Sequence, residues 1–403
     1  MKKIRMYNVG FGDCFCLRER KSSLLVDFGT SNKKIGNKLR DEVFDRVISD
    51  LSTMPRKNLL LSHFHPDHLS GLLYMMKKKD QAGEFHTIYL PDVFSQPQMT
   101  RILTIQIMAD LMNGSYLPGR QVSLAALLET LCSSPCHICL LKRGDIFEEK
   151  YQTLWPDTDW ILREVDDLIR GIPEAVLVGW NALYELAEQM RAVICSMTMD
   201  EEVLWKEGLK ASGVLQEGEN EDRETVCRRA GESLLKRFAQ VRKSQEVSQL
   251  LHYFERRQME LRRFKHKISI VFQNRTDGEL NVLFTGDIPS SYLQAVADNY
   301  DGSCPLHEHY WCIKVPHHGT GSHFFDFGRY TPDNMLISNG IYYANSRKQE
   351  RESRICGLYA GLFYIEDTTM YCASSENCEG YRSGCGCTCR EHEIIDPGYY
   401  KDI

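Results

Sequence analysis

The chain has 403 residues, 42% of them hydrophobic, and its formal net charge is −6 at neutral pH. The apolar fraction is sufficient for a folded core, which excludes an intrinsically disordered chain. The small negative charge excludes a general attraction to nucleic acid or anionic membranes, although it is compatible with a local basic surface. No run approaches the roughly 18 apolar residues of a membrane helix, and no signal-peptide core follows the first residues, so we expect a cytoplasmic protein without membrane contact.

Strand and helix patterns alternate over the first 160 residues. Strands are expected where short apolar runs are bounded by Gly, Asp or Pro, at 2–9, 14–19, 22–29, 58–62, 85–92 and within 137–157. Helices are expected where apolar residues recur every three or four positions, at 36–53, 68–79, 97–113 and 121–132. The alternation predicts an α/β layered protein.

The pattern changes between 161 and 262, where strand-like runs disappear and long amphipathic helices dominate. We expect this segment to be a helical insertion that acts as a cap or docks a partner protein. Strand patterns return over 263–365, and the tail at 366–403 is rich in Gly, Ser and Cys. The predicted layout is one α/β domain in two halves, 1–160 and 263–365, interrupted by the insertion and followed by the tail.

The stretch "HFHPDH", residues 63–68, concentrates the chemistry-bearing side chains. His63 and His65 point to the same side of an extended chain because side chains alternate. The proline after them ends the strand, which lets Asp67 and His68 face the same space from the start of the next helix. Imidazoles and a carboxylate suit Zn²⁺ and, with water in the shell, Mn²⁺ or Fe²⁺. The sequence thus predicts a metal site rather than a chance run of polar residues.

The pattern H-x-H-x-D-H resembles the signature of the metallo-β-lactamase-fold hydrolases, and later segments are similar to further motifs of that superfamily in the same order. Asp27 in "LLVDFG" matches the aspartate that ends an early strand beneath the metals. Asp287 in "LFTGDI" matches the aspartate that bridges them, and "KVPHHGTGSH" matches the late histidine motif. The stretches "NVGFGDCFCL" and "VPHHGTGS" are most similar to the hydrolase domain of DNA-uptake competence proteins and of phosphorylcholine esterases. The resemblance implies a four-layer αββα fold with the helical insertion outside it.

The same resemblance implies a dinuclear centre. His63 and His65 would hold one divalent ion and Asp67 and His68 the other, with Asp287 bridging the two. Zn²⁺ is the expected metal, with Mn²⁺ or Fe²⁺ as alternatives. Such a pair of ions can share a hydroxide and clamp the attacking and leaving oxygens of a phosphoester, so no serine or cysteine nucleophile is needed.

Two further positions complete the implied ligand set. Of the adjacent His317 and His318, one is expected to bind metal and the other to donate a proton to the leaving group. The motif does not decide between them; we assign His317 to the metal, and His318, with Asp67 and Asp287, to catalysis. His266 in "FKHKISIVFQ" is the candidate for the histidine that the superfamily carries on the strand before the Gly-Asp strand. The alternative is a solvent-facing residue of the basic run "RRFKHK".

Three residues are expected to support the ligands. Asp27 would orient a metal ligand. Asp13 would hold the loop "GFGD" at residues 10–13, called the opening loop below, by hydrogen bonds to backbone N–H groups. Asn345 in "YYANS" stands where the competence group often has Gly-His-Pro, so one contact with substrate or metal would be made differently.

The fifteen cysteines are expected to be reduced thiols or metal ligands rather than a disulfide framework. A structural zinc is a candidate in the tail, although the irregular spacing favours a thiol-rich tail without metal. The candidate ligands there are Cys372, Cys378, Cys385, Cys387, Cys389 and His392. The segment "CSSPCHIC" at 132–139 has closer zinc-like spacing, yet it adjoins a strand pattern, so buried thiols are expected.

The C-terminal half of the insertion is basic and could hold the backbone of a nucleic acid or nucleotide. Its cations include Arg228, Arg229, Lys236, Arg237, Arg242, Lys243, Arg256, Arg257, Arg262 and Arg263. The favoured alternative is a solvated helix face with glutamate partners. The predicted function is a metal-dependent phosphodiesterase or nuclease. The alternative is a non-catalytic or conditionally active subunit of a larger complex, such as one for defence against foreign DNA.

Overall fold

The computed structural model divides the chain into two compact units. The sheet unit contains Met1–His86, Leu141–Pro156 and Ser269–Ile403, and the helical unit contains Thr87–Leu140 and Asp157–Ile268. The residues described are 3–78, 85–114, 123–132, 136–199, 206–207, 209–210, 222–338, 359, 368–373, 391–396 and 398–403. The expected α/β class is confirmed by two large sheets of mixed strand direction together with helices.

The first sheet begins at the N-terminus of the chain. Within the sheet unit its strand order is β17, β1, β2, β3 and β6 (Tyr400–Asp402, Lys3–Tyr7, Cys14–Arg18, Ser23–Phe28 and Lys57–Leu60). These neighbours are antiparallel except β3 and β6, which run parallel with Leu25 opposite Leu59. The small hairpin of β4 and β5 (Lys34–Ile35 and Lys38–Leu39) leads from this sheet into the first helix.

The second sheet packs against the first through aromatic side chains. Its order is β16, β15, β14, β13, β12, β11, β10 and β9 (Glu391–Ile394, Thr369–Cys372, Asn334–Ile337, Cys312–Lys314, Val282–Phe284, Val271–Asn274, Tyr151–Trp155 and Ile146–Phe147). The strands from β12 to β16 are parallel, and those from β9 to β12 are antiparallel. The rings of Phe15 on β2 and Phe284 on β12 meet edge to face, 5.7 Å apart, so an apolar core lies between the two sheets.

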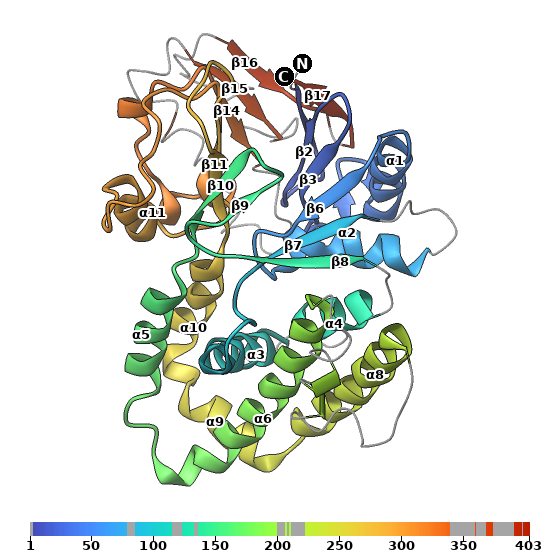
Figure 1. Ribbon diagram of the computed structural model, residues 1–403, viewed down its shortest axis with the longest axis vertical. Helices are drawn as coiled ribbons and strands as arrows, with labels where there is room; N and C mark the ends of the chain where they lie inside the picture. Colours follow the sequence, from blue (N-terminus) through green and yellow to red (C-terminus); the bar gives the residue numbers. More distant parts are fainter. Residues whose placement is uncertain are drawn as a thin grey trace. The chain divides into compact units, whose positions relative to one another are not determined.

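Helices α1 (Arg40–Ser52) and α2 (Pro66–Lys77) lie beside the first sheet (Figure 1). The apolar positions of α1 recur three or four residues apart and are buried, as in an amphipathic helix. The ring of Phe44 on α1 contacts that of Phe28 on β3 at 5.1 Å. On α2, a Cβ at Gly71 would come within 2.5 Å of the Phe28 ring, so glycine permits the close approach of this helix. Helix α11 (Ser290–Ala297) follows β12.

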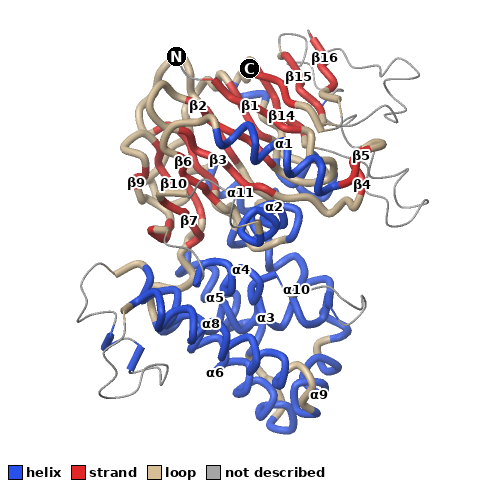
Figure 2. The backbone as a smooth tube through the Cα atoms, turned by 90° about the vertical axis from the view of Figure 1, so that its right-hand side faces the viewer, coloured by secondary structure: helices blue, strands red, loops and turns tan. Residues whose placement is uncertain are grey.

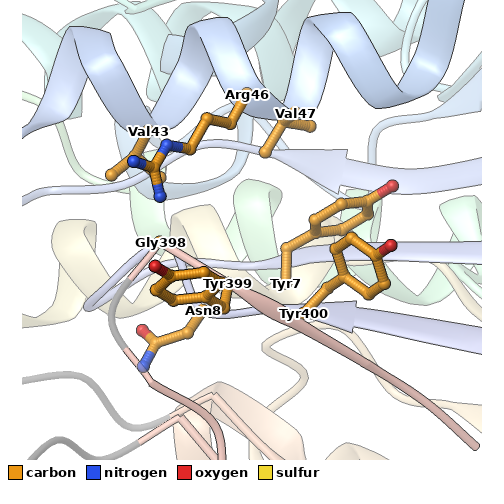
Figure 3. Close-up of a pocket in the computed structure, with 8 residues that line it drawn as sticks. All are labelled: Tyr7, Asn8, Val43, Arg46, Val47, Gly398, Tyr399 and Tyr400. Carbon is orange, nitrogen blue, oxygen red and sulfur yellow. The ribbon is translucent and has the colours of Figure 1, made fainter.

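The last strand fastens the end of the chain to its beginning. Arg5 on β1 donates hydrogen bonds to Asp402 on β17 at 2.5 and 2.7 Å and to Asp50 on α1 at 2.7 Å. A cavity of about 130 Å³ lies beside these strands, and Figure 3 shows Tyr7, Tyr399 and Tyr400 among the side chains that line it. The sequence pattern of the tail did not predict this final strand.

The helical unit consists mainly of packed helices (Figure 2). Its main helices are α3 (Thr100–Gly114), α4 (Ser123–Cys132), α5 (Thr158–Ile169), α6 (Glu174–Met197), α8 (Arg223–Val241), α9 (Gln245–Tyr253) and α10 (Gln258–Phe264). Strands β7 (Thr87–Pro91) and β8 (His137–Leu141) are neighbours in sheet order. Helix α3 packs on α6, and α4 packs on α8. None of the described helices is both long and apolar enough to span a bilayer.

The division into units differs from the predicted insertion at 161–262, because residues 87–140 join the helical unit as well. The physical reason lies in α3, which is apolar on nearly all sides. Ile102, Leu103, Ile105 and Met108 are fully buried on it, as in a helix enclosed by other helices. The sequence pattern had assigned this helix to the α/β domain.

Candidate metal centre

The stretch 63–68 folds as a strand end followed by a helix start. Strand β6 ends at Leu60, and His65 occupies the N-cap position of α2 with extended backbone angles. Pro66 is the first residue of the helix, where its missing N–H costs nothing. The carboxylate of Asp67 therefore lies in the first helical turn, where the helix dipole stabilises a negative charge.

Four buried side chains gather their ligand atoms within 4.8 Å of one another: Asp67, His68, Asp287 and His318. Nε2 of His68 lies 3.1 Å from Oδ2 of Asp287, and Nε2 of His318 lies 3.3 Å from Oδ2 of Asp67. Asp287 follows β12, and His318 follows β13, so the group draws on loops after parallel strands of the second sheet. Buried imidazoles and carboxylates at this spacing form a candidate metal site.

Asp287 presents a single oxygen to the surrounding histidines. The Nε2 atoms within 4 Å of its Oδ2 belong to His63 (3.8 Å), His68 (3.1 Å), His317 (3.7 Å) and His318 (3.7 Å). His65 lies next to His63, with its Nδ1 atom 2.9 Å from Nε2 of that residue. The predicted bridging aspartate is thus at the centre of the predicted ligands in the sheet unit.

Two further carboxylates hold the opposite side of the imidazoles. Asp27 lies 2.9 Å from Nδ1 of His68 and accepts hydrogen bonds from the backbone N–H and hydroxyl of Ser62, both at 2.7 Å. Asp13 lies 3.0 Å from Nδ1 of His318. A carboxylate at Nδ1 leaves Nε2 as the ligand atom, an arrangement typical of metal-binding histidines. The donor set therefore fits a divalent ion such as Zn²⁺.

Asp13 does not act as the sequence predicted. Its carboxylate was expected to bond to backbone N–H groups of the opening loop. Instead it lies against Lys314, His318 and Ser338 from the second sheet and the loops after it. The opening loop is held through the main chain of Asp13, whose N–H donates to the carbonyl of Asp67 at 3.0 Å.

The electrostatics of the group favour a cation among the carboxylates. Burial alone would lower the pKa of His318, but Asp287 and Asp13 raise it to about 9. The pKa of His68 is likewise raised well above its usual value, because Asp287 and Asp27 outweigh the effect of burial. Without a metal ion, protons on these imidazoles compensate the buried negative charge. Divalent ions could take the place of those protons.

The two adjacent histidines have different surroundings. Nδ1 of His317 contacts the hydroxyl of Thr320, and its ring lies 4.1 Å from that of His323. Burial holds the pKa of His317 well below its usual value. Its side chain is 20% exposed, whereas that of His318 is fully buried among the carboxylates. The geometry therefore favours His318 as the ligand and leaves His317 as the less buried residue, the reverse of the assignment made from sequence.

His266 was expected on a strand, but it lies in the short 3-10 helix Lys265–Ile268 that ends the helical unit. Its side chain is buried, which contradicts the solvent-facing alternative. Strand β11 begins only at Val271. The backbone N–H of Ile270 donates to the carbonyl of Ser62 at 2.9 Å, so the chain re-enters the sheet unit beside the H-x-H-x-D-H stretch.

Several predicted positions lie outside the described residues. Asn345 and the tail cysteines Cys378, Cys385, Cys387 and Cys389 belong to this set, as does the side chain of His392. Cys372 is buried on β15. In the segment at 132–139, Cys132 at the end of α4 and Cys136 just before β8 are buried as expected, and Cys139 on β8 is half-buried. Among the described residues no cysteine belongs to a group with metal-binding spacing.

The basic surface of the helical unit has acidic partners. Arg237 pairs with Glu185 at 2.7 Å, and Arg257 pairs with Glu260 at 2.8 Å. The Arg257 pair joins residues three apart, as expected of a solvated helix face, whereas Arg237 on α8 pairs with a glutamate of α6. A nucleic-acid surface on this unit stays a prediction.

Sequence reasoning missed Lys314 and His323. Lys314 is the last residue of β13, and its fully buried ammonium reaches Asp13 and Asp287. The signal was a lysine inside the apolar run "WCIKV", because a buried lysine requires a partner. His323 ends the same "HHGTGSH" stretch and was passed over because it falls outside the paired histidines.

We compared the chain with known protein families and with curated proteins. Neither the family models nor the curated proteins that were compared with this chain gave a match.

Proposed function

We propose that the chain is a dinuclear metal-dependent hydrolase of the metallo-β-lactamase fold, acting on a phosphodiester. The observation that carries the proposal is the position of Asp287, whose Oδ2 atom faces imidazoles from the H-x-H-x-D-H stretch and from the late histidine pair. A carboxylate placed between two sets of histidines is the ligand expected to bridge two ions.

The layered sheets support the proposed fold. Asp27 stands near the end of β3, and the other candidate ligands of the sheet unit follow β6, β12 and β13. The candidate site thus lies where strands of both sheets end, the usual position of sites in α/β proteins. The αββα layering itself remains part of the proposal.

Zn²⁺ is the first choice of metal because the donors are imidazole nitrogens and carboxylate oxygens, with Mn²⁺ and Fe²⁺ as alternatives. When bound, two such ions lower the pKa of water and clamp the oxygens of a phosphoester. His63, His65, Asp67, His68, Asp287 and His318 would hold the ions. His266 is buried and stays a predicted further ligand.

The remaining residues would orient the histidine ligands and contact the substrate. Asp27 and Asp13 fix Nδ1 of His68 and His318, so both rings keep Nε2 directed at Asp287. His317 is the less buried member of the pair and would meet the substrate. Its lowered pKa keeps the imidazole neutral at pH 7, so it would accept or donate a hydrogen bond rather than supply a positive charge.

The test is turnover of bis-p-nitrophenyl phosphate, DNA and RNA by protein loaded with Zn²⁺ or Mn²⁺. We expect the Asp67→Ala/His68→Ala variant to lose at least about 100-fold in rate, because it removes two ligands of one ion. The matched control is Asp41→Ala/His252→Ala, which changes the same residue types at exposed positions. Equal turnover by wild type and the ligand variant would contradict the proposal.

The alternative, a non-catalytic subunit that docks through its helices, predicts a different result. Protein never exposed to a chelator would then carry almost no metal. Metal analysis of the freshly purified protein separates the two hypotheses before any substrate is chosen.

A further inference from the structure

We propose that Lys314 is a positioning residue of the candidate metal centre, whose ammonium fixes Asp287 and Asp13 so that both carboxylates orient the ligands. This inference rests on the proposed function, since it concerns the ions that the site would hold. Lys314 touches neither substrate nor metal in this proposal and acts through the two aspartates.

Lys314 lies in the middle of the second sheet. Strand β13 runs between β12 and β14, with Lys314 opposite Phe284 on one side and Leu336 on the other. Its side chain is 1% exposed. An ammonium is costly to bury, so a lysine in this position needs enough acceptors to replace its water.

The ammonium has three nearby acceptors for its three donor hydrogens. Nζ lies 2.5 Å from Oδ2 of Asp13, 2.8 Å from the carbonyl oxygen of Gly286 and 3.5 Å from Oδ1 of Asp287. The contacts with Gly286 and Asp287 are hydrogen bonds, and the contact with Asp13 is an ion pair, so the ammonium charge is compensated by two carboxylates.

The contact with Asp287 separates the two oxygens of that carboxylate. Oδ1 faces Lys314, while Oδ2 faces the imidazoles, including Nε2 of His68 at 3.1 Å. A cation on one oxygen sets the rotation of the carboxylate and leaves the other oxygen directed at the ligand space.

The contact with Asp13 extends the same control to His318. Oδ2 of Asp13 meets Lys314, and Oδ1 lies 3.0 Å from Nδ1 of His318. Lys314 thus holds the carboxylate that selects which nitrogen of His318 is left as the ligand atom. One ammonium connects a residue of the opening loop, the central aspartate and the late histidine.

The experiment compares wild type with Lys314→Met by zinc titration against a chromophoric chelator and by the visible spectrum of the Co²⁺-loaded protein. We expect the variant to bind at least one ion about 10- to 100-fold more weakly, the range found when residues behind metal ligands are changed. Its Co²⁺ absorption bands should also shift, because the ligand geometry changes. Lys34→Met, at an exposed position of β4, is the matched control and should behave as wild type.

A second variant keeps the proposal testable if Lys314→Met does not fold. Lys314→Met leaves the Asp13 carboxylate buried without its cation, whereas Lys314→Met/Asp13→Asn removes that charge and should melt closer to wild type. Because Asp13→Asn alone should already weaken zinc binding, the double variant is compared with that single variant, and we expect it to bind zinc still more weakly and to give a different Co²⁺ spectrum. Wild-type zinc affinity and an unchanged spectrum in Lys314→Met, or a double variant that binds zinc and absorbs light as Asp13→Asn alone does, would overturn the positioning role.

The two proposals fail in different ways. Wild-type protein that binds zinc but cleaves no diester would contradict the proposed hydrolase, while the affinity and spectrum of the Lys314 variants would still decide the positioning role. Wild-type protein that binds no divalent ion would overturn both.

Discussion

Oδ1 of Asp13 lies 3.0 Å from Nδ1 of His318, so a residue of the opening loop orients a histidine of the late motif. The relationship predicts that Asp13→Asn weakens zinc binding about 10- to 100-fold, because the amide lacks the charge that holds His318. Zinc titration against a chelator measures the change. Asp41→Asn, at an exposed position on α1, is the control that should leave the affinity unchanged. Unaltered binding by Asp13→Asn would mean that His318 needs no carboxylate partner.

Alanine variants of His317 and His318 should differ in metal content and in activity. We expect His318→Ala to lose one bound ion per chain, because Nε2 of His318 lies between Asp67 and Asp287. His317→Ala should retain both ions and lose activity instead, because its partly exposed ring would meet the substrate. Metal content by mass spectrometry and turnover of a diester distinguish the two. The reverse result would restore His317 as the ligand.

Zinc affinity should rise with pH. In the metal-free protein the pKa of His318 is raised to about 9, and that of His68 is also raised by Asp287 and Asp27 against the effect of burial. His318 is therefore protonated at pH 7, the shift of His68 acts in the same direction, and an imidazole must lose its proton before that nitrogen can bind metal. Between pH 6 and 8 the affinity should increase about tenfold per pH unit for each proton displaced. Calorimetry in buffers of different ionisation enthalpy counts these protons, and a pH-independent affinity without proton release would contradict the expectation.

The helical unit should depend on one buried ion pair. Lys265 pairs with Asp110 of α3, and both side chains are more than nine-tenths buried. Asp110→Ala would leave the ammonium without its partner, which costs about 3 to 5 kcal/mol in comparable buried pairs. Glu185→Ala, which breaks the exposed pair with Arg237, should cost no more than about 1 kcal/mol. Urea unfolding measures both, and equal small effects would show that the buried pair is dispensable.

The sequence predicted those parts of the fold that depend on local pattern. The helix that begins at Pro66 and the strand that ends at Leu60 follow from apolar spacing and from a proline at the first helical position. Residues 87–140 joined the helical unit against expectation, because the helix expected to be amphipathic at 97–113 is buried on nearly all sides. The final strand β17 was missed because its pairing with β1 joins the two ends of the chain.

The candidate site was predicted where residue type alone indicates chemistry. The histidines and aspartates of the 63–68 stretch and Asp287 were named from sequence, and the fold brings Asp67, His68 and Asp287 together. The order of His317 and His318 depends on the left-handed backbone angles of both residues, which a motif does not encode. Lys314 was missed because its partners Asp13 and Asp287 come from opposite ends of the sequence.

The central claim is that the cluster around Asp287 holds two divalent ions. The most direct measurement is an anomalous difference map, recorded at the zinc absorption edge, from crystals grown with Zn²⁺. We expect two peaks about 3.5 to 4 Å apart, with Asp287 between them and one peak beside Asp67, His68 and His318. A map with no peak beside Asp287, from crystals that contain zinc, would contradict the claim.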